Sequence, residues 1–175
     1  ILFIPLDDDV ELWDVRIKNN SGRLRKLSAF SYVEFSFHHV EIDNQNFQMS
    51  LYASGSNFKD EIIEYDFFYE PWTFHFFASN FNPDSYDCVR DSFIGSYRSE
   101  TNPIAVENGK CSNSTELGGN HCGSLHKKLE LQSGEEIRLI FMLGVGSREE
   151  KGREIKSKYS DLKNISLIPG LYFVS

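Results

Sequence analysis

The chain has 175 residues, and its 18 basic and 26 acidic side chains sum to a formal net charge of −8. Hydrophobic residues make up 40% and aromatic residues 14% of the sequence, which is typical of one soluble globular domain and excludes intrinsic disorder. No run of about 18 apolar residues is present, which excludes a transmembrane helix. The acidic excess argues against nucleic acid and against an anionic membrane surface as partners.

The cysteine content indicates the compartment. Cys88, Cys111 and Cys122 are too few, and odd in number, for a disulfide framework, so we expect a reducing, cytoplasmic location. No signal peptide precedes the first expected strand. Because the sequence begins at Ile1 and not at Met, we expect a fragment of a longer protein.

Short β-strands dominate the first third of the chain. Residues 12–18 alternate between apolar and polar side chains and predict a half-buried strand. Residues 24–40 carry apolar side chains in both phases, which predicts one strand covered on both faces. Residues 47–53 alternate again, and the Gly-Ser-Asn sequence at 55–57 is expected to end that strand.

The strand pattern continues further along the chain. Residues 61–69 and 72–79 predict two aromatic strands separated by Pro71. Residues 125–132 and 137–145 predict the two strands of a β-hairpin, joined through a Ser-Gly turn.

Two segments depart from this pattern. Residues 148–159 have a helical period after a capping-box sequence from Ser147 to Glu150, and Gly152 is expected to weaken this helix slightly. Residues 80–120 are rich in Gly, Pro, Asn, Asp and Ser and predict a long functional loop or an insertion. The predicted fold is therefore all-β, an antiparallel β-sandwich with one helix near the C-terminus.

Candidate metal ligands are poorly spaced. Cys111, His121, Cys122 and His126 lie close together in the sequence but lack the paired spacing of a zinc site, and adjacent residues on a strand face opposite sides. We therefore predict no metal site. The acidic run at residues 7–9 lacks the calcium-loop spacing and predicts an acidic turn.

Catalytic and sugar-binding signals are also weak. The nucleophile-elbow sequence G-x-S-x-G is absent, so nucleophilic catalysis has no support. Four aromatic residues could stack on sugar rings, although a place in the sandwich core is the favoured interpretation: Tyr69, Trp72, Phe74 and Phe76.

Five stretches, taken together, resemble a known family. They are residues 10–15 (VELWDV), 30–35 (FSYVEF), 43–48 (DNQNFQ), 87–97 (DCVRDSFIGSY) and 131–144. Over residues 2–162 the chain resembles the amino-terminal β-sandwich domain of the cellobiose and cellodextrin phosphorylases, glycoside hydrolase family ninety-four. The resemblance implies a supersandwich of the galactose-mutarotase type.

The resemblance also implies a reaction for the parent enzyme. Enzymes of this family cleave a β-linked glucose disaccharide or oligosaccharide with inorganic phosphate and release an α-sugar 1-phosphate with inversion. Phosphate is the nucleophile and one carboxylic acid protonates the leaving oxygen, so no metal or organic cofactor is implied. The catalytic acid lies in an (α/α)6 barrel that does not resemble any part of this chain, so we predict no catalytic residue here and no activity of the chain alone.

The same resemblance implies substrate-binding residues at the mouth of the active site. Asn46, Phe47 and Gln48 match a family segment near the substrate, where the amides can bind sugar hydroxyls and the ring can offer an apolar face. An ordinary strand is the alternative. Met49 stands where cellobiose phosphorylases tend to have arginine, and the loop at 97–123 is more similar to the cellodextrin type, so the acceptor sugar stays open.

The domain assignment follows the extent of the resemblance. Residues 1–162 are expected to form the sandwich domain and residues 163–175 an atypical tail, as in a truncation. The leading hypothesis is a non-catalytic domain that packs on the barrel and supports homodimerisation and the active-site mouth. A stand-alone carbohydrate-binding module and an interaction domain without sugar affinity are the alternatives.

Overall fold

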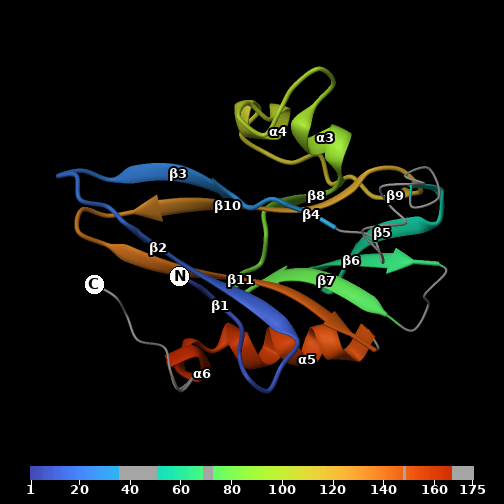
Figure 1. The fold of residues 1–175 in the computed structure, drawn as a ribbon. Helices are drawn as coiled ribbons and strands as arrows, with labels where there is room; N and C mark the ends of the chain where they lie inside the picture. The colour runs from blue at the N-terminus through green and yellow to red at the C-terminus, as the bar shows by residue number, and fades with distance from the viewer. Residues whose placement is uncertain (36–50, 69–72, 148, 167–175) are drawn as a thin grey trace.

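Two antiparallel β-sheets face each other in the computed structural model, which describes residues 1–35, 51–68, 73–147 and 149–166 (Figure 1). The strands of the seven-stranded sheet are β1 (Leu2–Phe3), β2 (Val10–Lys18), β5 (Ser54–Lys59), β6 (Ile62–Phe67), β7 (Phe74–Ser79), β9 (Glu116–Leu117) and β11 (Glu136–Gly146). Those of the four-stranded sheet are β3 (Arg25–Phe30), β4 (Val33–Glu34), β8 (Ser85–Val89) and β10 (His121–Leu131). The predicted antiparallel sandwich is confirmed.

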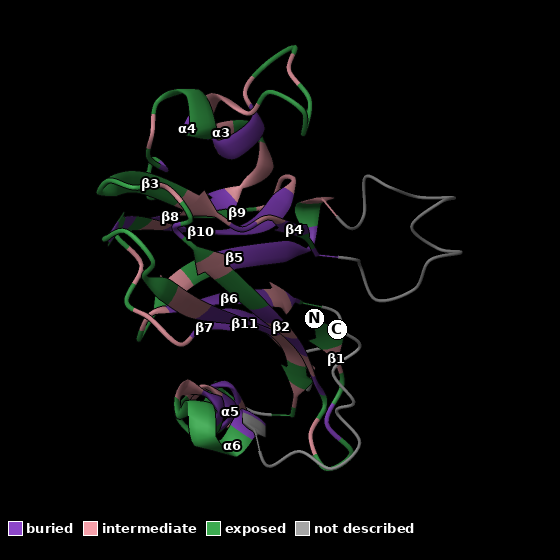
Figure 2. Cartoon of the chain, turned by 90° about the vertical axis from the view of Figure 1, so that its left-hand side faces the viewer, coloured by how far each residue is buried: buried purple, intermediate pink, exposed green. Residues whose placement is uncertain are grey.

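The helices lie on the outer faces of the two sheets. They are α3 (Arg90–Ile94), α4 (Ile104–Glu107), α5 (Glu149–Ser160) and α6 (Leu162–Ser166). Figure 2 shows the layers in order, from α3 and α4 through the two sheets to α5 and α6. The prediction of a single helix near the end therefore missed α3 and α4, and no helix of the described residues has the length and apolar character to span a membrane.

The strand order explains how the chain closes the sandwich. The large sheet runs β1-β2-β11-β7-β6-β5-β9, and in the small sheet β10 pairs with β3, β4 and β8. The predicted hairpin between residues 125–132 and 137–145 is wrong, because β10 and β11 are consecutive strands of different sheets.

Asn19 holds the point where the chain changes sheets. Its side-chain amide donates hydrogen bonds to the carbonyl oxygens of Arg23, Leu131 and Gln132 at 2.8–3.0 Å. The turn after β2 and the turn after β10 are thus tied together. A hydrophobic pattern read along one segment reports strand character but not which sheet the strand joins.

The predicted strand over residues 24–40 is divided. Ser31 interrupts it, because its hydroxyl accepts a hydrogen bond from the Leu125 N–H at 3.0 Å and its N–H donates to the Leu125 carbonyl. Two strands result, β3 and β4, and most of β3 is exposed, so the prediction of a strand covered on both faces is wrong there. Residues 36–40 lie outside the described residues.

The segment around residue 55 also differs from the prediction. Leu51 and Tyr52 are helical, while residues 47–50 lie outside the described part of the chain. Strand β5 runs through the expected break at 55–57 and pairs with both β6 and β9. Gly55 permits this, because a Cβ atom there would lie only 3.0 Å from the Leu117 side chain.

The core has two main parts. One lies between the sheets and includes Tyr65, Phe77 and Phe141, and the other lies between the large sheet and α5. Phe74 and Phe76 belong to the second part, which confirms their interpretation as core residues. Tyr69 and Trp72 lie outside the described residues.

Helix α5 confirms the predicted helix near the C-terminus. Gly152 has a packing role that the sequence did not indicate, since a Cβ atom there would lie 3.2–3.3 Å from the rings of Phe74 and Phe76. The acidic turn before β2 is tied to this helix, because the Asp8 carboxylate accepts hydrogen bonds from Lys158 and the Tyr159 hydroxyl at 2.6–2.7 Å. Helix α6 crosses the predicted boundary at residue 162, and residues 167–175 lie outside the described chain.

Candidate functional site

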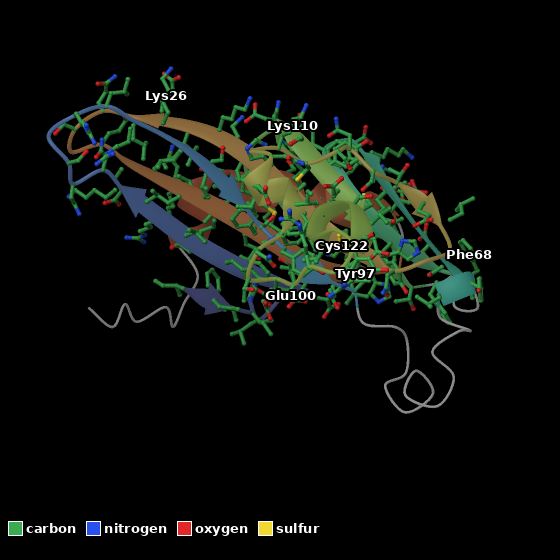
Figure 3. All side chains as sticks on the ribbon, turned by 90° about the horizontal axis from the view of Figure 1, so that it is seen from above. Lys26, Phe68, Tyr97, Glu100, Lys110 and Cys122 are labelled. Carbon is green, nitrogen blue, oxygen red and sulfur yellow. The ribbon has the colours of Figure 1, made fainter. Side chains whose placement is uncertain are left out.

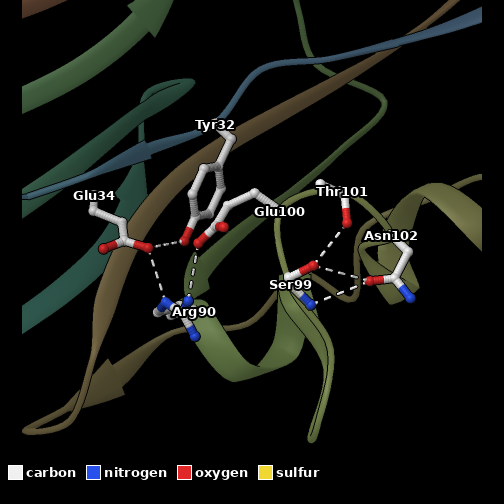
Figure 4. Close-up of polar contacts among 7 residues, drawn as sticks. All are labelled: Tyr32, Glu34, Arg90, Ser99, Glu100, Thr101 and Asn102. Carbon is white, nitrogen blue, oxygen red and sulfur yellow. Dashed lines mark hydrogen bonds and ion pairs between the residues drawn. The ribbon is translucent and has the colours of Figure 1, made fainter.

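The predicted substrate-binding residues Asn46, Phe47 and Gln48 lie outside the described residues, so their role stays a prediction. The chain reaches that segment from β4. Glu34, the last residue of β4, belongs to a polar network on the outer side of the small sheet (Figure 4). This network is the best-defined functional candidate among the described residues.

Arg90 is the centre of the network. It stands where β8 passes into α3, and its Nε donates to Glu34 Oε1 at 2.8 Å. Its Nη2 donates to Glu100 Oε1 at 3.0 Å, and the Tyr32 hydroxyl donates to the same Glu34 oxygen at 2.6 Å (Figure 4). One guanidinium therefore joins β4, the start of α3 and the loop between α3 and α4.

The charges of this network are mutually satisfied. Burial alone would raise the pKa of Glu34, but the hydrogen bonds from Tyr32 and Arg90 outweigh it and hold that pKa below its ordinary value. Burial and the bond to Glu34 raise the pKa of the Tyr32 phenol. Near neutral pH, Glu34 is thus an anion that has no proton to give, and Tyr32 is a neutral phenol that holds its proton more tightly than usual. Neither group is suited to act as a general acid. Arg90 is engaged by two carboxylates, and the network positions the chain.

The loop between α3 and α4 presents one aromatic side chain. Tyr97 is fully exposed and has a φ of 62°, in the left-handed region that is strained for a non-glycine residue. Beyond it, the Asn102 side chain accepts a hydrogen bond from the Ser99 N–H, and Arg98 pairs with Glu107. Figure 3 shows Tyr97 and Glu100 on the face that carries α3 and α4. The loop is braced on the C-terminal side of its exposed tyrosine.

A small apolar core lies beneath this loop. Phe93 and Ile94 of α3 and Ala105 of α4 pack on Cys122 of β10. The Tyr32 ring stacks on Phe93 with centroids 4.9 Å apart and planes at 15°. The two short helices therefore cover the outer face of the small sheet as one unit, which we call the insertion (residues 90–113).

Asp87 fixes the returning end of the insertion. Its buried carboxylate accepts hydrogen bonds from the N–H and the hydroxyl of Ser112 at 3.0 and 2.6 Å, and from those of Ser114 at 3.1 and 2.8 Å. The segment predicted as a long loop thus contains β8, both helices and β9. Helices of four or five residues are too short to leave a periodic signal in the sequence.

Comparison of the sequence with known families identifies the family to which this sandwich and its insertion belong. The sequence model of the family "Glycosyl hydrolase 94, supersandwich domain" matches residues 1–162. The chain belongs to this family. The resemblance expected from the sequence is confirmed, and Arg90 and Asp87 fall in the stretch at 87–97 that contributed to it.

Curated relatives of this supersandwich domain include phosphorylases. The N,N'-diacetylchitobiose phosphorylase of Vibrio proteolyticus is 52% identical over 167 residues, and that of Vibrio furnissii 48%. The solabiose phosphorylase of Paenibacillus borealis is 28% identical over 160 residues. These alignments cover 94% of the chain for the two Vibrio relatives and 90% for the third. The chain spans 21% of the length of each of these relatives.

The cysteine and histidine residues weighed as metal ligands have other partners in the supersandwich domain. His121 Nδ1 lies 2.7 Å from the Ser56 hydroxyl, and His126 Nδ1 lies 2.9 Å from that of Ser85. Cys111 and Cys122 are buried free thiols, and burial raises the pKa of Cys111 to about 12. Among the described residues, no three histidine, cysteine or acidic side chains form a group that could hold a metal ion.

Two further carboxyl groups have shifted acidity. Burial, with a further contribution from Glu149, raises the pKa of Glu64 and of Asp66, which lie on the same face of β6. This face is covered by α5, so they lie on the opposite side of the sandwich from the insertion. The alternation of the sequence predicts that Glu64 and Asp66 share one face of β6. It does not predict that this face lies against α5, which begins at Glu149, far along the chain.

Proposed function

We propose that this chain is the supersandwich domain of a larger disaccharide phosphorylase and that it has no catalytic activity alone. The main support is the extent of the alignment, which covers 94% of the chain but only 21% of the Vibrio proteolyticus phosphorylase. The satisfied charges around Arg90 support a positioning role for the domain. A cytoplasmic location, and independence of any cofactor other than phosphate as co-substrate, stay predictions.

For the parent enzyme we propose N,N'-diacetylchitobiose as the substrate, cleaved with inorganic phosphate. The support is the name shared by the two relatives at 52% and 48% identity. The names of the relatives give no support to cellobiose or cellodextrin, the sugars expected from the family resemblance. Asn46, Phe47 and Gln48 remain the proposed contacts to this sugar.

The insertion is proposed as the face through which the domain meets the rest of the enzyme, either its catalytic barrel or a second subunit. Tyr97 supports this, because backbone strain of this kind is concentrated at functional sites and its exposed ring is available for contact with a partner. Arg90 would then hold the loop and β4 in one arrangement.

The test is an activity measurement on the purified chain. We expect no N-acetylglucosamine 1-phosphate from the chain incubated with phosphate and N,N'-diacetylchitobiose, and turnover above background would overturn the proposal. Calorimetric titration with the same disaccharide separates the alternatives. Binding that is saturable at micromolar sugar, without the rest of the enzyme, would favour a stand-alone carbohydrate-binding module.

A further inference from the structure

A pocket of about 440 Å³ opens where the returning end of the insertion meets β8 and β10. Ser85, Cys111 and His126 are buried residues of its wall, while Lys110, Asn113 and Lys128 are exposed. Figure 3 shows Lys110 on the upper side of the molecule, where the insertion lies. The polar network around Arg90 shares none of these residues.

Hydrogen bonds in the wall engage one of the two imidazole nitrogens of His126. The Cys111 N–H donates to the Ser85 hydroxyl oxygen at 2.9 Å, so the hydroxyl hydrogen is available for His126 Nδ1, also at 2.9 Å. We adopt the tautomer in which the Ser85 hydroxyl donates to Nδ1 and the proton of the neutral ring is on Nε2. Burial lowers the pKa of His126, which keeps the ring neutral, and stacking on Phe30 at 4.4 Å fixes its plane.

His126 Nε2 is a buried donor with no hydrogen-bond partner among the described residues. A buried donor without an acceptor is destabilising by about 1–3 kcal/mol and is retained where a ligand or a special role requires it. Because the ring forms part of the pocket wall, an oxygen of a ligand that reached Nε2 would accept this N–H.

The exposed groups of the pocket add further donors. Neither Lys110 nor Lys128 has a carboxylate partner within the described residues, whereas Asp84 is already engaged by Lys127 at 3.5 Å and by the Lys128 N–H at 2.7 Å. The Asn113 side-chain oxygen accepts the Tyr86 N–H at 3.0 Å, so its NH₂ group is left to donate. The pocket therefore offers two ammonium groups, from Lys110 and Lys128, and two neutral donors, from His126 and Asn113. Its one carboxylate, that of Asp84, is already hydrogen-bonded.

We propose that this pocket binds a small oxyanion, either inorganic phosphate or the phosphate group of a sugar 1-phosphate. Phosphate oxygens only accept hydrogen bonds when ionised, and charge-assisted bonds from ammonium groups are the strongest that these side chains can form. The net charge of −8 does not prevent this, because salt at physiological strength screens charges beyond about 8 Å. The pocket alone carries the inference for inorganic phosphate, whereas a sugar 1-phosphate as ligand rests on the proposed phosphorylase role.

The test is a titration of the ¹⁵N-labelled chain with inorganic phosphate at constant ionic strength, followed by NMR. We expect saturable shifts of the Asn113 side-chain amide and of the backbone amides of residues 110–113, and a higher pKa of the His126 imidazole in phosphate. N-acetylglucosamine 1-phosphate in a second titration distinguishes the two sources: tighter binding than phosphate means that the sugar is also recognised. N-acetylglucosamine, the uncharged arm, is expected to leave these signals unchanged.

The double variant Lys110→Gln with Lys128→Gln is expected to raise the Kd for phosphate at least about tenfold. The matched control is Lys18→Gln with Lys163→Gln, which removes two exposed lysines at the end of β2 and in α6 and changes the net charge equally. All four side chains are exposed, so both variants should fold. Absence of saturable shifts, equal weakening in the control, or equal binding of N-acetylglucosamine would each overturn the proposal.

Discussion

The two sheets of this sandwich are covered on their outer faces by different means. Helix α5 covers the large sheet through apolar contacts, with Ile155 and Tyr159 in a continuous core and Gly152 against the rings of Phe74 and Phe76. The insertion covers the small sheet with two short helices whose ends are fixed by buried or partly buried polar groups, chiefly Asp87 and Arg90. Apolar packing tolerates small displacements, whereas hydrogen-bonded charges define one geometry. Both covers contribute to stability, but only the insertion side is held in one defined geometry by hydrogen-bonded charges.

The largest expected effect is at Asp87. Asp87→Ala would leave the N–H and hydroxyl donors of Ser112 and Ser114 without their acceptor, and we expect the free energy of unfolding to fall by about 3–4 kcal/mol. Hydrogen exchange should increase first at residues 111–114. Asp91→Ala, at an exposed position in the first turn of α3, is the control and should be nearly neutral. Equal losses in both variants would show that Asp87 does not act as an anchor.

The corresponding change on the α5 side is Ile155→Ala. It leaves a cavity under the helix, so we expect a loss of about 2–4 kcal/mol in denaturant unfolding. Glu154→Ala, on the exposed side of the same helix, should change the stability little. If the comparison holds, hydrogen exchange in the insertion stays unchanged in Ile155→Ala. Increased exchange there would mean that the two covers are coupled.

These two sites also show what could be predicted from sequence. Ile155 and Tyr159 stand four positions apart in a periodic segment, so α5 was found within about one residue. Asp87 contacts residues 25 and 27 positions away, and Arg90 contacts Glu34 56 positions away, and no local pattern specifies such pairings. The same limit explains why the sequence predicts a hairpin where β10 and β11 belong to different sheets. Strand character is local, but the choice of partner strand depends on turns such as that held by Asn19.

The contribution to stability of the turn before β2, which is bonded to α5 through Asp8, should depend on pH. Burial would raise the pKa of Asp8, but hydrogen bonds from Lys158, Tyr159 and Lys151 hold it below its ordinary value of 3.8. A carboxyl group with a lowered folded pKa stabilises the fold above its unfolded pKa, and this contribution is lost as the pH falls through the folded pKa. We expect Asp8→Asn to lower stability by about 1–2 kcal/mol at neutral pH and by progressively less below pH 3.8.

The control for that titration is Asp7→Asn at the neighbouring exposed position. It should follow the wild-type stability curve at every pH. A constant difference between Asp8→Asn and wild type, persisting at low pH, would show that the carboxylate of Asp8 does not act through its charge.

The smallest expected effect is a gain in stability at Tyr97. Its φ of 62° is strained for tyrosine and its side chain is fully exposed, so Tyr97→Gly should stabilise the isolated chain by about 0.5–1 kcal/mol in thermal unfolding. Tyr97→Asn should give a smaller gain, because asparagine tolerates this conformation better than tyrosine. Loss of stability in both variants would mean that the ring has a stabilising contact within the domain, against its proposed role as an exposed contact.

The central claim, that this domain supports a phosphorylase by positioning through its insertion, is tested most directly in a chimera. Residues 1–162 would replace the matching part of the Vibrio proteolyticus N,N'-diacetylchitobiose phosphorylase, which is 52% identical to the chain. The measurement is kcat/KM for phosphate-dependent cleavage of N,N'-diacetylchitobiose, with and without Tyr97→Gly. We predict activity within about tenfold of the unmodified enzyme for the chimera, and a loss of about tenfold or more on Tyr97→Gly at unchanged or higher thermal stability. A folded chimera without activity, or one indifferent to Tyr97→Gly, would contradict the account.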